Sequence, residues 1–197
     1  ISAEHLQYGA VTVRRLSDGE AKMMSVRIRS QRGVNSEQAA EIVLDARKIA
    51  KRYPGDAAVL TALAEAEYDA GNDAQAIAAA DAAIAIDPTK ANAYVQKGYA
   101  LFRMAEDADD IDAAYNAAMA PFSALNKLEN DHPMPLMYYY RSFGMRGEEP
   151  PEQAKLALER AAQLAPFDKS LWLNVALMQA GEGKISLARQ SLAPLAS

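Results

Sequence analysis

The sequence contains no cysteine, which excludes a disulfide framework and any thiolate metal site. This absence leaves the compartment open, because cytoplasmic and exported proteins can both lack cysteine. Aromatic residues make up only 7% of the chain, which disfavours a sandwich of aromatic-rich strands. No apolar run approaches the ~20 residues that a membrane-spanning helix needs, so we expect no membrane insertion.

Residues that carry catalytic chemistry are also scarce. The only two histidines, His5 and His132, are far apart in the sequence, and His132 precedes a proline, as a turn residue does. There is no His-Glu-x-x-His zinc motif and no Gly-x-Ser-x-Gly nucleophile elbow. The segment 181–184 is too short for a phosphate-binding loop. We therefore predict a protein that is not an enzyme and that has no cofactor or metal.

An acidic run at residues 106–112 raises the question of calcium binding. An EF-hand loop that began at Asp107 would have Asp112 in the place of its glycine and Ala118 in the place of its last glutamate. Carboxylates near the start of a helix interact favourably with the positive end of the helix dipole. The run therefore predicts a helix N-terminus rather than a calcium site.

Charge is distributed unevenly along the chain. The net charge is −5, yet residues 1–52 contain ten Lys and Arg against six Asp and Glu. The remainder is therefore strongly acidic. A basic start followed by an acidic body disfavours a continuous nucleic-acid-binding surface, and we expect no nucleic-acid partner.

The chain does have apolar residues arranged with a period. Hydrophobic residues make up 50% of it and alanine is frequent, a composition that favours closely packed helices. Prolines follow short apolar helix ends at spacings of 34, 45 and 33 residues, at Pro54, Pro88, Pro133 and Pro166. A helix-turn-helix of 34 residues is the period of the tetratricopeptide repeat.

Residues 57–88 show this repeat most clearly. With Ala57 as the first position, Gly71 falls at the turn between two helices and Pro88 closes the repeat. Glu67 stands where the repeat has an aromatic residue, and Tyr68 follows one place later. The remaining matches are small or apolar residues at packing positions: Leu60, Leu63, Ala64, Ala76, Ala80 and Ala83.

The other repeats are less regular. The last one, counted from Lys169, stops at Pro194 and matches at Trp172, Val175, Ala176, Gly183, Ala188 and Leu192. The second matches at Tyr94 and Gly98, and its second half is longer than the family period by about a dozen residues. The third matches at Tyr140, Phe143, Gly144, Ala154, Leu158, Ala161 and Pro166.

Together these residues resemble a divergent, bacterial-type member of the tetratricopeptide-repeat family. The resemblance implies an all-α fold, a right-handed superhelical solenoid of antiparallel helix pairs with about four to five repeats. It assigns residues 36–197 to the repeat domain, with repeats at about 57–90, 91–134, 135–168 and 169–197. Residues 1–35 are then an N-terminal arm or a degenerate first helix.

Several local signals refine this prediction. Ser17 and Glu20 have the spacing of a capping box that opens a helix to about Arg32. Residues 24–29 alternate between apolar and polar, however, which is also typical of a strand. Pro121 should kink or split the helix predicted for residues 112–130. We predict helix N-caps at Ser36, Asp56, Asp73 and Ser170.

The resemblance also implies a function, the binding of a protein or peptide by a non-enzymatic scaffold. The family lines its concave face with the first helix of each repeat, and the residues in the corresponding places are Tyr68, Asn92, Tyr99, Phe102, Arg103, Tyr138 and Arg141. The two arginines suit a carboxylate ligand. An alternative assigns Phe102 and some of the tyrosines to the core between repeats.

Two further functions remain open at this point. The chain begins at Ile1 rather than Met, so it could be the non-catalytic C-terminal repeat tail of a larger, peptidase-like enzyme. It could also self-associate to a homo-oligomer by stacking the end near residues 172–196 on a second copy. The sequence names neither the partner nor the localisation.

Overall fold

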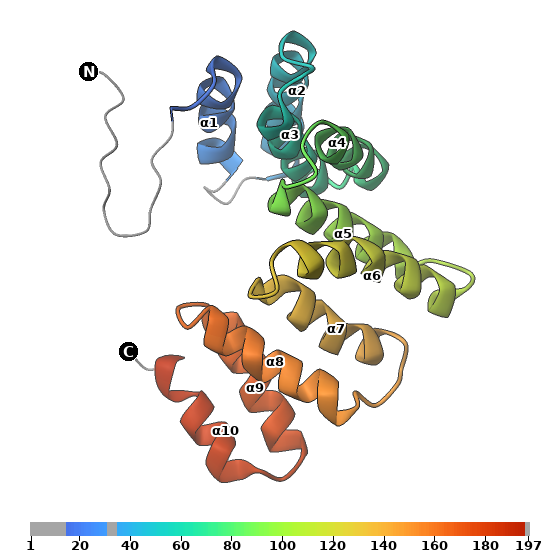
Figure 1. Ribbon diagram of the computed structural model, residues 1–197, viewed down its shortest axis with the longest axis vertical. Coiled ribbons are helices and arrows are strands. Elements are labelled where there is room, and N and C mark those ends of the chain that lie inside the picture. Colours follow the sequence, from blue (N-terminus) through green and yellow to red (C-terminus); the bar gives the residue numbers. More distant parts are fainter. Residues whose placement is uncertain (1–14, 31–34, 196–197) are drawn as a thin grey trace. The chain divides into compact units, whose positions relative to one another are not determined.

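The computed structural model describes residues 15–30 and 35–195, and this part of the chain is all-helical (Figure 1). Its helices are α1 (Asp18–Ser30), α2 (Ser36–Arg52), α3 (Ala57–Asp69), α4 (Asp73–Ile86), α5 (Ala91–Ala105), α6 (Ile111–Leu128), α7 (Pro133–Met145), α8 (Glu152–Leu164), α9 (Lys169–Gly181), α10 (Ile185–Ser191) and a 3-10 turn, η1 (Ala193–Leu195). The predicted all-α class is confirmed.

Consecutive helices pack as hairpins, in the pairs α1/α2, α3/α4, α5/α6, α7/α8 and α9/α10. Three of these hairpins turn at a glycine with a positive φ, namely Gly71 at 82°, Gly147 at 72° and Gly183 at 75°. Residues with a Cβ rarely adopt this conformation, so glycine is the residue that the turn requires. The turn predicted at Gly71 is therefore present, and Gly183, a matched position of the last repeat, forms the equivalent turn.

The chain divides into two compact units, residues 1–90 and 91–197. In the first unit, α1, α2 and α3 share a core of small and branched apolar side chains, among them Met23, Val26, Ile42, Val43 and Val59. A second cluster joins α3 to α4 through Ala64, Ala79 and Ala80. Alanines at these positions let two helices approach closely, as the repeat pattern predicts.

A buried ion pair links the helices of the first unit and occupies the repeat position where an aromatic residue is usual. Glu67 of α3 is 2% exposed. Its carboxylate accepts hydrogen bonds from Arg47 of α2 at 2.6 and 2.8 Å and from Asn72 Nδ2 at 2.9 Å. The side chain that departs from the family pattern is thus fully partnered, and it ties α2 to α3 and to the α3/α4 turn.

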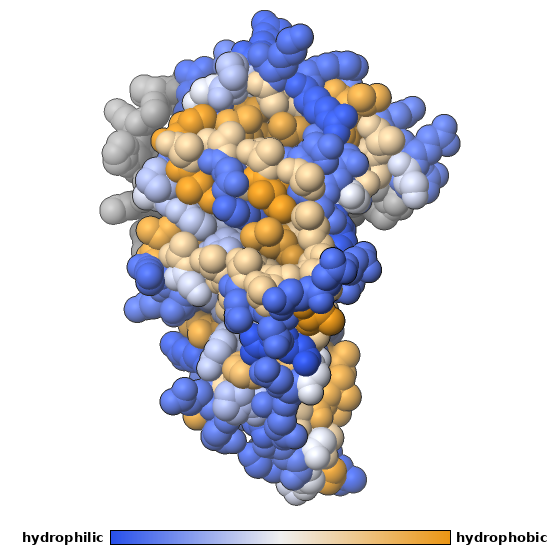
Figure 2. Space-filling view, turned by 90° about the vertical axis from the view of Figure 1, so that its right-hand side faces the viewer, coloured by the Kyte–Doolittle hydropathy of each residue, from blue (hydrophilic) through white to orange (hydrophobic). Residues whose placement is uncertain are grey.

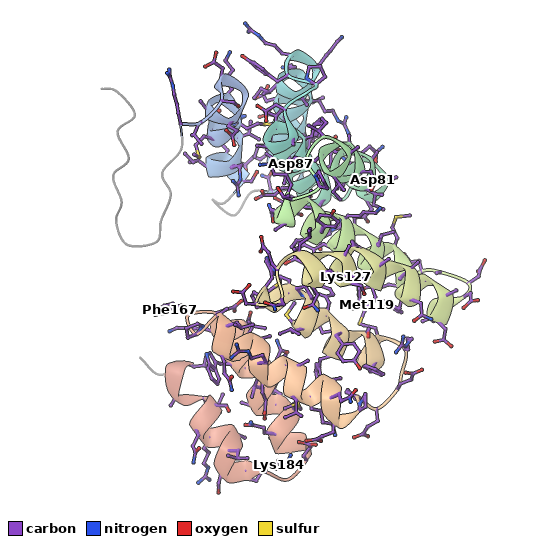
Figure 3. The ribbon with its side chains drawn as sticks, viewed as in Figure 1. Asp81, Asp87, Met119, Lys127, Phe167 and Lys184 are labelled. Carbon is purple, nitrogen blue, oxygen red and sulfur yellow. The ribbon has the colours of Figure 1, made fainter. Side chains whose placement is uncertain are left out.

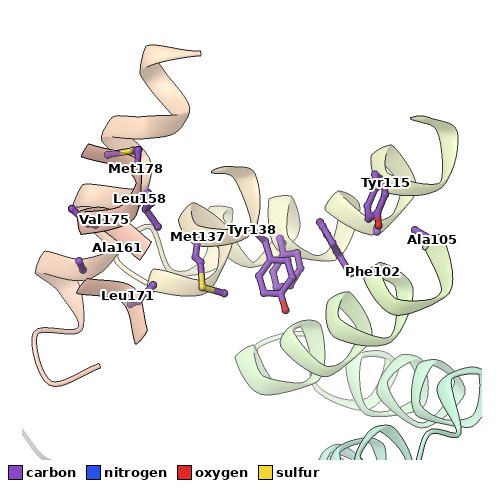
Figure 4. Packing of buried hydrophobic residues seen from close by; sticks show 13 residues of the cluster. Phe102, Ala105, Tyr115, Met137, Tyr138, Leu158, Ala161, Leu171, Val175 and Met178 are labelled. Atoms are coloured by element: carbon purple, nitrogen blue, oxygen red, sulfur yellow. The ribbon is translucent and has the colours of Figure 1, made fainter. Parts of the chain in front are cut away.

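The second unit has an aromatic core. Phe102 of α5, Tyr115 and Phe122 of α6, and Tyr138 of α7 pack with ring centroids 4.4–5.8 Å apart. The cluster continues through Leu158 to Leu171 and Val175 of α9 (Figure 4). These residues come from five successive helices, so one core holds α5 to α9 together.

Gly98 lets α5 and α6 approach closely. A Cβ placed on Gly98 would lie 2.4 Å from Cζ of Phe122, well inside van der Waals contact. This is the role that the repeat pattern predicts for a small residue at this position.

Two large aromatic residues, Phe167 in the α8–α9 loop and Trp172 in the first turn of α9, have contrasting surroundings. Trp172, the only tryptophan of the chain, packs against the core of the second unit, and its indole N–H donates to the Pro166 carbonyl at 3.1 Å. Phe167 is 96% exposed and points away from the helices (Figure 3). The indole therefore ties the loop to α9, whereas Phe167 makes no such contribution.

The N-terminal segment forms a helix, and the strand alternative is wrong for residues 18–30. The predicted capping box is present, because the Glu20 N–H donates to Ser17 Oγ at 3.0 Å and the Ser17 N–H donates to Glu20 Oε2 at 2.8 Å. Met23 and Val26 point into the core at a spacing of three residues, which is a helical and not a strand periodicity. Of residues 1–35, predicted as an N-terminal arm or a degenerate first helix, residues 1–14 and 31–34 lie outside the described residues.

Of the four predicted N-caps, only Asp56 is correct, since its carboxylate accepts from the N–H groups of Ala58 and Val59. The caps of α2 and α9 are Asn35 and Asp168, one and two residues earlier than Ser36 and Ser170. Asp73 lies inside the first turn of α4. In each case a polar residue slightly upstream takes the capping position.

The predicted split at Pro121 does not occur. Helix α6 runs without interruption from Ile111 to Leu128, and Pro121 is buried within it. The flanking residues Ala118, Phe122 and Leu125 are fully buried. Packing of this face offsets the hydrogen bond that proline cannot donate.

Candidate peptide-binding surface

The predicted concave residues fall in both units, and their exposure differs widely. Tyr68 lies half-buried on α3 in the first unit, and the other six belong to the second unit. Asn92 and Arg141 are exposed, while Tyr99 and Arg103 are half-buried. Phe102 and Tyr138 are only 4% and 8% exposed and belong to the aromatic core. These two therefore support the packing alternative more than direct ligand contact.

At one edge of the aromatic core, Tyr138 contacts the exposed side chain of Arg141. The Arg141 guanidinium lies 5.1 Å from the centroid of the Tyr138 ring, and that ring stacks on Phe122 at 4.4 Å with an interplanar angle of 16°. Tyr99 contacts the other side of this group, with its ring 5.4 Å from Tyr138 and its hydroxyl 3.1 Å from the sulfur of Met134. A cation on an aromatic face is attracted to it and held in place.

Arg141 is exposed on α7. Within residues 15–30 and 35–195 it forms no ion pair, and its contact is the stacking on Tyr138. A guanidinium carries five N–H donors in a planar fork that matches a carboxylate. Arg141 thus presents a pre-positioned and exposed cation on α7.

The turn glycines show how α7 aligns with the other first helices. Gly71 and Gly183 each follow the first position of their repeat, Ala57 and Lys169, by 14 residues. The equivalent glycine of the third repeat is Gly147, so the first position of that repeat is Pro133. The matches given above for Tyr140, Phe143 and Gly144 assume a first position four residues later, which is about one helical turn. Gly144 accordingly has open space around it rather than a tight helix contact.

This register explains the exposure of the residues on α7. In the family pattern, Arg141 moves from the fifth to the ninth position, and both are ligand-facing. Tyr138 moves from the second to the sixth position, which is not ligand-facing, and its side chain is indeed buried.

The second unit also contains a hollow of about 790 Å³ beside this surface. It lies between α7, the α7–α8 loop, the start of α8 and the second half of α9. Its walls combine charged, aromatic and aliphatic groups: Tyr140, Gly147, Glu148, Glu149, Pro150, Lys155, Asn174, Leu177, Met178, Gly181 and Glu182. None of the charged residues here was singled out from the sequence.

An ion-pair network lines the hollow. Lys155 of α8 donates to Glu182 at 2.8 Å and lies 3.5 Å from Glu149. Glu182 also contacts Lys184 at 3.0 Å, at the α9–α10 turn labelled in Figure 3. The hydrogen bond from Lys155 and the contact with Lys184 lower the pKa of Glu182, and the bond to Glu182 raises the pKa of Lys155. Lys155 and Glu182 are therefore both charged at neutral pH.

Tyr140 forms the aromatic wall of the hollow. Burial raises the pKa of its phenol, and the nearby carboxylates Glu182 and Glu149 act in the same direction, against the effect of Lys155. The phenol therefore stays neutral. Its ring and the exposed Leu177 provide apolar contact area next to the carboxylates.

Surface hydropathy agrees with a mixed binding surface. Figure 2 shows one face of the molecule, on which hydrophobic residues gather in patches bordered by hydrophilic ones. On α9, Leu173 and Leu177 are 44% and 62% exposed. Large exposed aliphatic side chains near charged groups are common at protein-binding surfaces.

The described residues lack two further features. They contain no group of three or more His, Asp or Glu side chains placed to hold a metal ion. Among the same residues, no helix is long and apolar enough to cross a membrane.

Antiparallel hairpins that follow one another along the chain, closed by equivalent glycine turns, define a helical-repeat protein. No protein-family model matches the sequence, and neither does any curated protein sequence. Solved structures, however, are similar over nearly the whole chain. TTC0263, a thermophilic TPR protein of Thermus thermophilus, superposes with a TM-score of 0.73 at 15% identity, over 89% of this chain and 88% of its own.

Two further structures give the same result. PilF of Pseudomonas aeruginosa matches with a TM-score of 0.69 at 19% identity, over 90% of this chain and 75% of its own. MamA of Desulfovibrio magneticus RS-1, from residue 41 to its end, matches with a TM-score of 0.58 at 17% identity, over 90% and 93%. The chain thus has the tetratricopeptide-repeat fold, as the sequence predicted.

Proposed function

We propose that the chain is a non-enzymatic scaffold that binds an acidic segment of a protein or peptide on the first helices of its repeats. Arg141 carries this proposal, since its guanidinium is exposed, stacked on Tyr138 and without an ion pair among the described residues. Asn92, Tyr99 and Arg103, all on α5, supply further polar groups of the same surface. Tyr68 is the corresponding first-helix candidate of the first unit.

The buried aromatic residues contribute to this function indirectly. Phe102 and Tyr138 hold α5 and α7 in fixed positions, so the groups they support are pre-organised. Pre-organisation reduces the entropy lost on binding and thereby increases affinity. Tetratricopeptide folds host binding functions widely, and this analogy of fold adds support without naming the ligand.

A pull-down from the source lysate tests the proposal with one charge reversal. Arg141→Glu should lose a partner that the wild-type chain retains, because a carboxylate would then repel an acidic segment. Arg160→Glu on α8 is the matched control, since Arg160 is also exposed in the second unit but lies on a second helix. Circular dichroism should show both variants to be folded.

Equal capture of the partner by Arg141→Glu and wild type would contradict the proposed surface. Loss of the partner by the Arg160→Glu control as well would indicate a general effect of charge. In that case, the first helices would have no special part in binding.

A further inference from the structure

Two leucines are exposed on α9, the first helix of the last repeat. Leu173 and Leu177 are 44% and 62% exposed, and because they are four residues apart they share one face of the helix. Leu177 lies six residues before the turn glycine Gly183, and Arg141 lies six residues before the turn glycine Gly147. Arg141 and Leu177 therefore occupy equivalent places on successive first helices.

The face of α9 that carries these leucines has no charge. After Lys169, its first residue, α9 contains no charged side chain. The amide of Asn174, which is exposed between the two leucines, already donates to the Ser170 carbonyl at 2.9 Å. What this face offers a ligand is therefore aliphatic contact, which favours an apolar side chain over a charged one.

The surface that carries Arg141 extends to these leucines. Tyr140, the neighbour of Arg141 on α7, and Leu177 of α9 both line the hollow described above, so the two helices border the same space. Lys155 and Glu182 also line this hollow, but they are paired with each other at 2.8 Å. The contact that Leu177 adds beside this pair is apolar.

The repeat geometry sets the distance between the cation and the leucines along a bound chain. Helix α8 contacts both α7 and α9, and the axes of contacting helices are ~8–10 Å apart. Equivalent places on α7 and α9 are therefore separated by roughly 10–20 Å. An extended peptide advances ~3.3 Å per residue, so ~3–6 residues bridge this separation.

We propose that the bound segment combines an acidic residue at Arg141 with a large apolar residue, such as leucine, at Leu173 and Leu177. The carboxylate accepts from the guanidinium, and the apolar side chain removes the two exposed leucines from water. The inference rests on the proposed function, because the acidic residue at Arg141 brings the segment to this face. The ligand is then an acidic and apolar pair at a defined spacing.

Peptide pools test this pair with the full chain. Fluorescein-labelled pools have one fixed Glu and one fixed Leu at increasing separations on either side of it, with all other positions degenerate, and are titrated by fluorescence anisotropy. Matched pools replace the Leu by Ser or the Glu by Gln. At separations of ~3–6 residues, the Leu pools should bind about tenfold more tightly than the Ser pools, and adjacent Glu and Leu should give no such advantage.

The salt dependence distinguishes the two contacts. Raising the salt concentration should reduce the preference for Glu over Gln, because that preference depends on charge. The preference for Leu over Ser should remain.

Three variants assign the preference for Leu to α9. Leu173→Ser, Leu177→Ser and the double variant remove exposed aliphatic groups, and the double variant should bind the Leu and Ser pools equally. Leu156→Ser is the matched control, because Leu156 is 55% exposed in the same unit but lies on the second helix α8. This control should keep the full advantage of the Leu pools, and circular dichroism should show every variant to be folded.

The outcomes separate this inference from the function on which it rests. Equal binding of the Leu and Ser pools by the wild-type chain at every separation overturns the apolar contact, and a retained preference for Glu leaves the proposed function standing. A preference for Leu that persists in the double variant, or that Leu156→Ser also loses, overturns the assignment to α9. Binding of no pool contradicts the proposed function itself.

Discussion

Glu67 shows how one residue can depart from a family pattern and still stabilise the fold. An aromatic side chain at its position would add apolar area, whereas Glu67 brings a charge into the interior. Such a charge is costly unless it is paired and hydrogen-bonded. Arg47 and Asn72 provide three hydrogen bonds, so the charge becomes a link between α2, α3 and the following turn. The sequence showed the departure but not the partners, because they are 20 and five residues away.

His132 has a structural role that depends on its protonation. It is the N-cap of α7, and its Nδ1 accepts a hydrogen bond from the Met134 N–H at 3.3 Å. Only the neutral ring can accept at this atom. Burial lowers the pKa of His132, and Glu129 and Asp131 partly oppose this effect. The sequence placed His132 in a turn correctly but missed the cap.

This cap should make stability depend on pH. The folded pKa is lower than the unfolded value of about 6.5, so the folded chain binds fewer protons there. The contribution is complete above about pH 6.5 and is lost as the pH falls through the folded pKa. Between pH 7.5 and 5.5, roughly, wild type should lose more unfolding free energy than His132→Asn, by at most about 1 kcal/mol, the usual worth of an N-cap.

Urea unfolding at the two pH values measures this difference. Asparagine can cap without titrating in this range, and His5 is common to both proteins, so its effect cancels. The same pH dependence in wild type and variant would show that protonation of His132 does not reach the cap.

At the scale of single elements, local signals predicted the helices but placed three of the four N-caps one or two residues too late. Ser17 and Glu20 carry their own capping box, and α1 begins there. Helix α6 shows the limit of local signals, since Pro121 is a helix breaker by its chemistry. The burial of Phe122 and Leu125 keeps the helix continuous. That burial depends on contacts with α5 and α7, which cannot be inferred from the sequence of α6 alone.

Helix α7 shows a second limit, that of alignment. Its repeat motif could be read in two registers one turn apart, and aromatic residues at 138, 139 and 140 fit both. The register is decided by Gly147, whose positive φ marks the turn. Arg141 is exposed in the structure, whereas Tyr138 belongs to the core, and the hollow beside α9 was not predicted.

The two glycines near the end of α7 allow a matched prediction. A Cβ on either Gly144 or Gly147 would meet no heavy atom within 4 Å, so only the backbone conformation differs. Gly147→Ala should cost about 1–2 kcal/mol, because its φ of 72° is unfavourable for alanine. Gly144→Ala lies inside the helix and should stabilise it by about 0.5 kcal/mol. Chemical denaturation of both variants gives the comparison, and equal effects would contradict the register.

At the scale of the whole molecule, the division into two units determines how far the effect of a destabilising mutation extends. Each unit contains its own apolar clusters, and repeat folds are stabilised mainly by contacts between neighbours. A local defect should therefore remain local. The repeat period predicted the hairpins but not the division, because no composition shift marks the boundary at residues 90 and 91.

Gly98→Leu tests this locality. The new side chain would overlap Phe122, which lies 2.4 Å from the Cβ position, and such overpacking costs about 1–3 kcal/mol. Hydrogen exchange should show faster exchange in α5 and α6, with little change in α1 to α3. Uniformly faster exchange over both units would mean that the chain unfolds as a single cooperative body.

Trp172 is an intrinsic fluorescence probe of the second unit. As the only tryptophan, packed against the core of the second unit, it is the sole source of fluorescence excited at the red edge of protein absorption. A melting curve recorded by that emission follows residues 91–197 and is blind to residues 1–90. Set beside a circular dichroism curve, which averages over every helix, it reveals whether the two units melt in one transition or two.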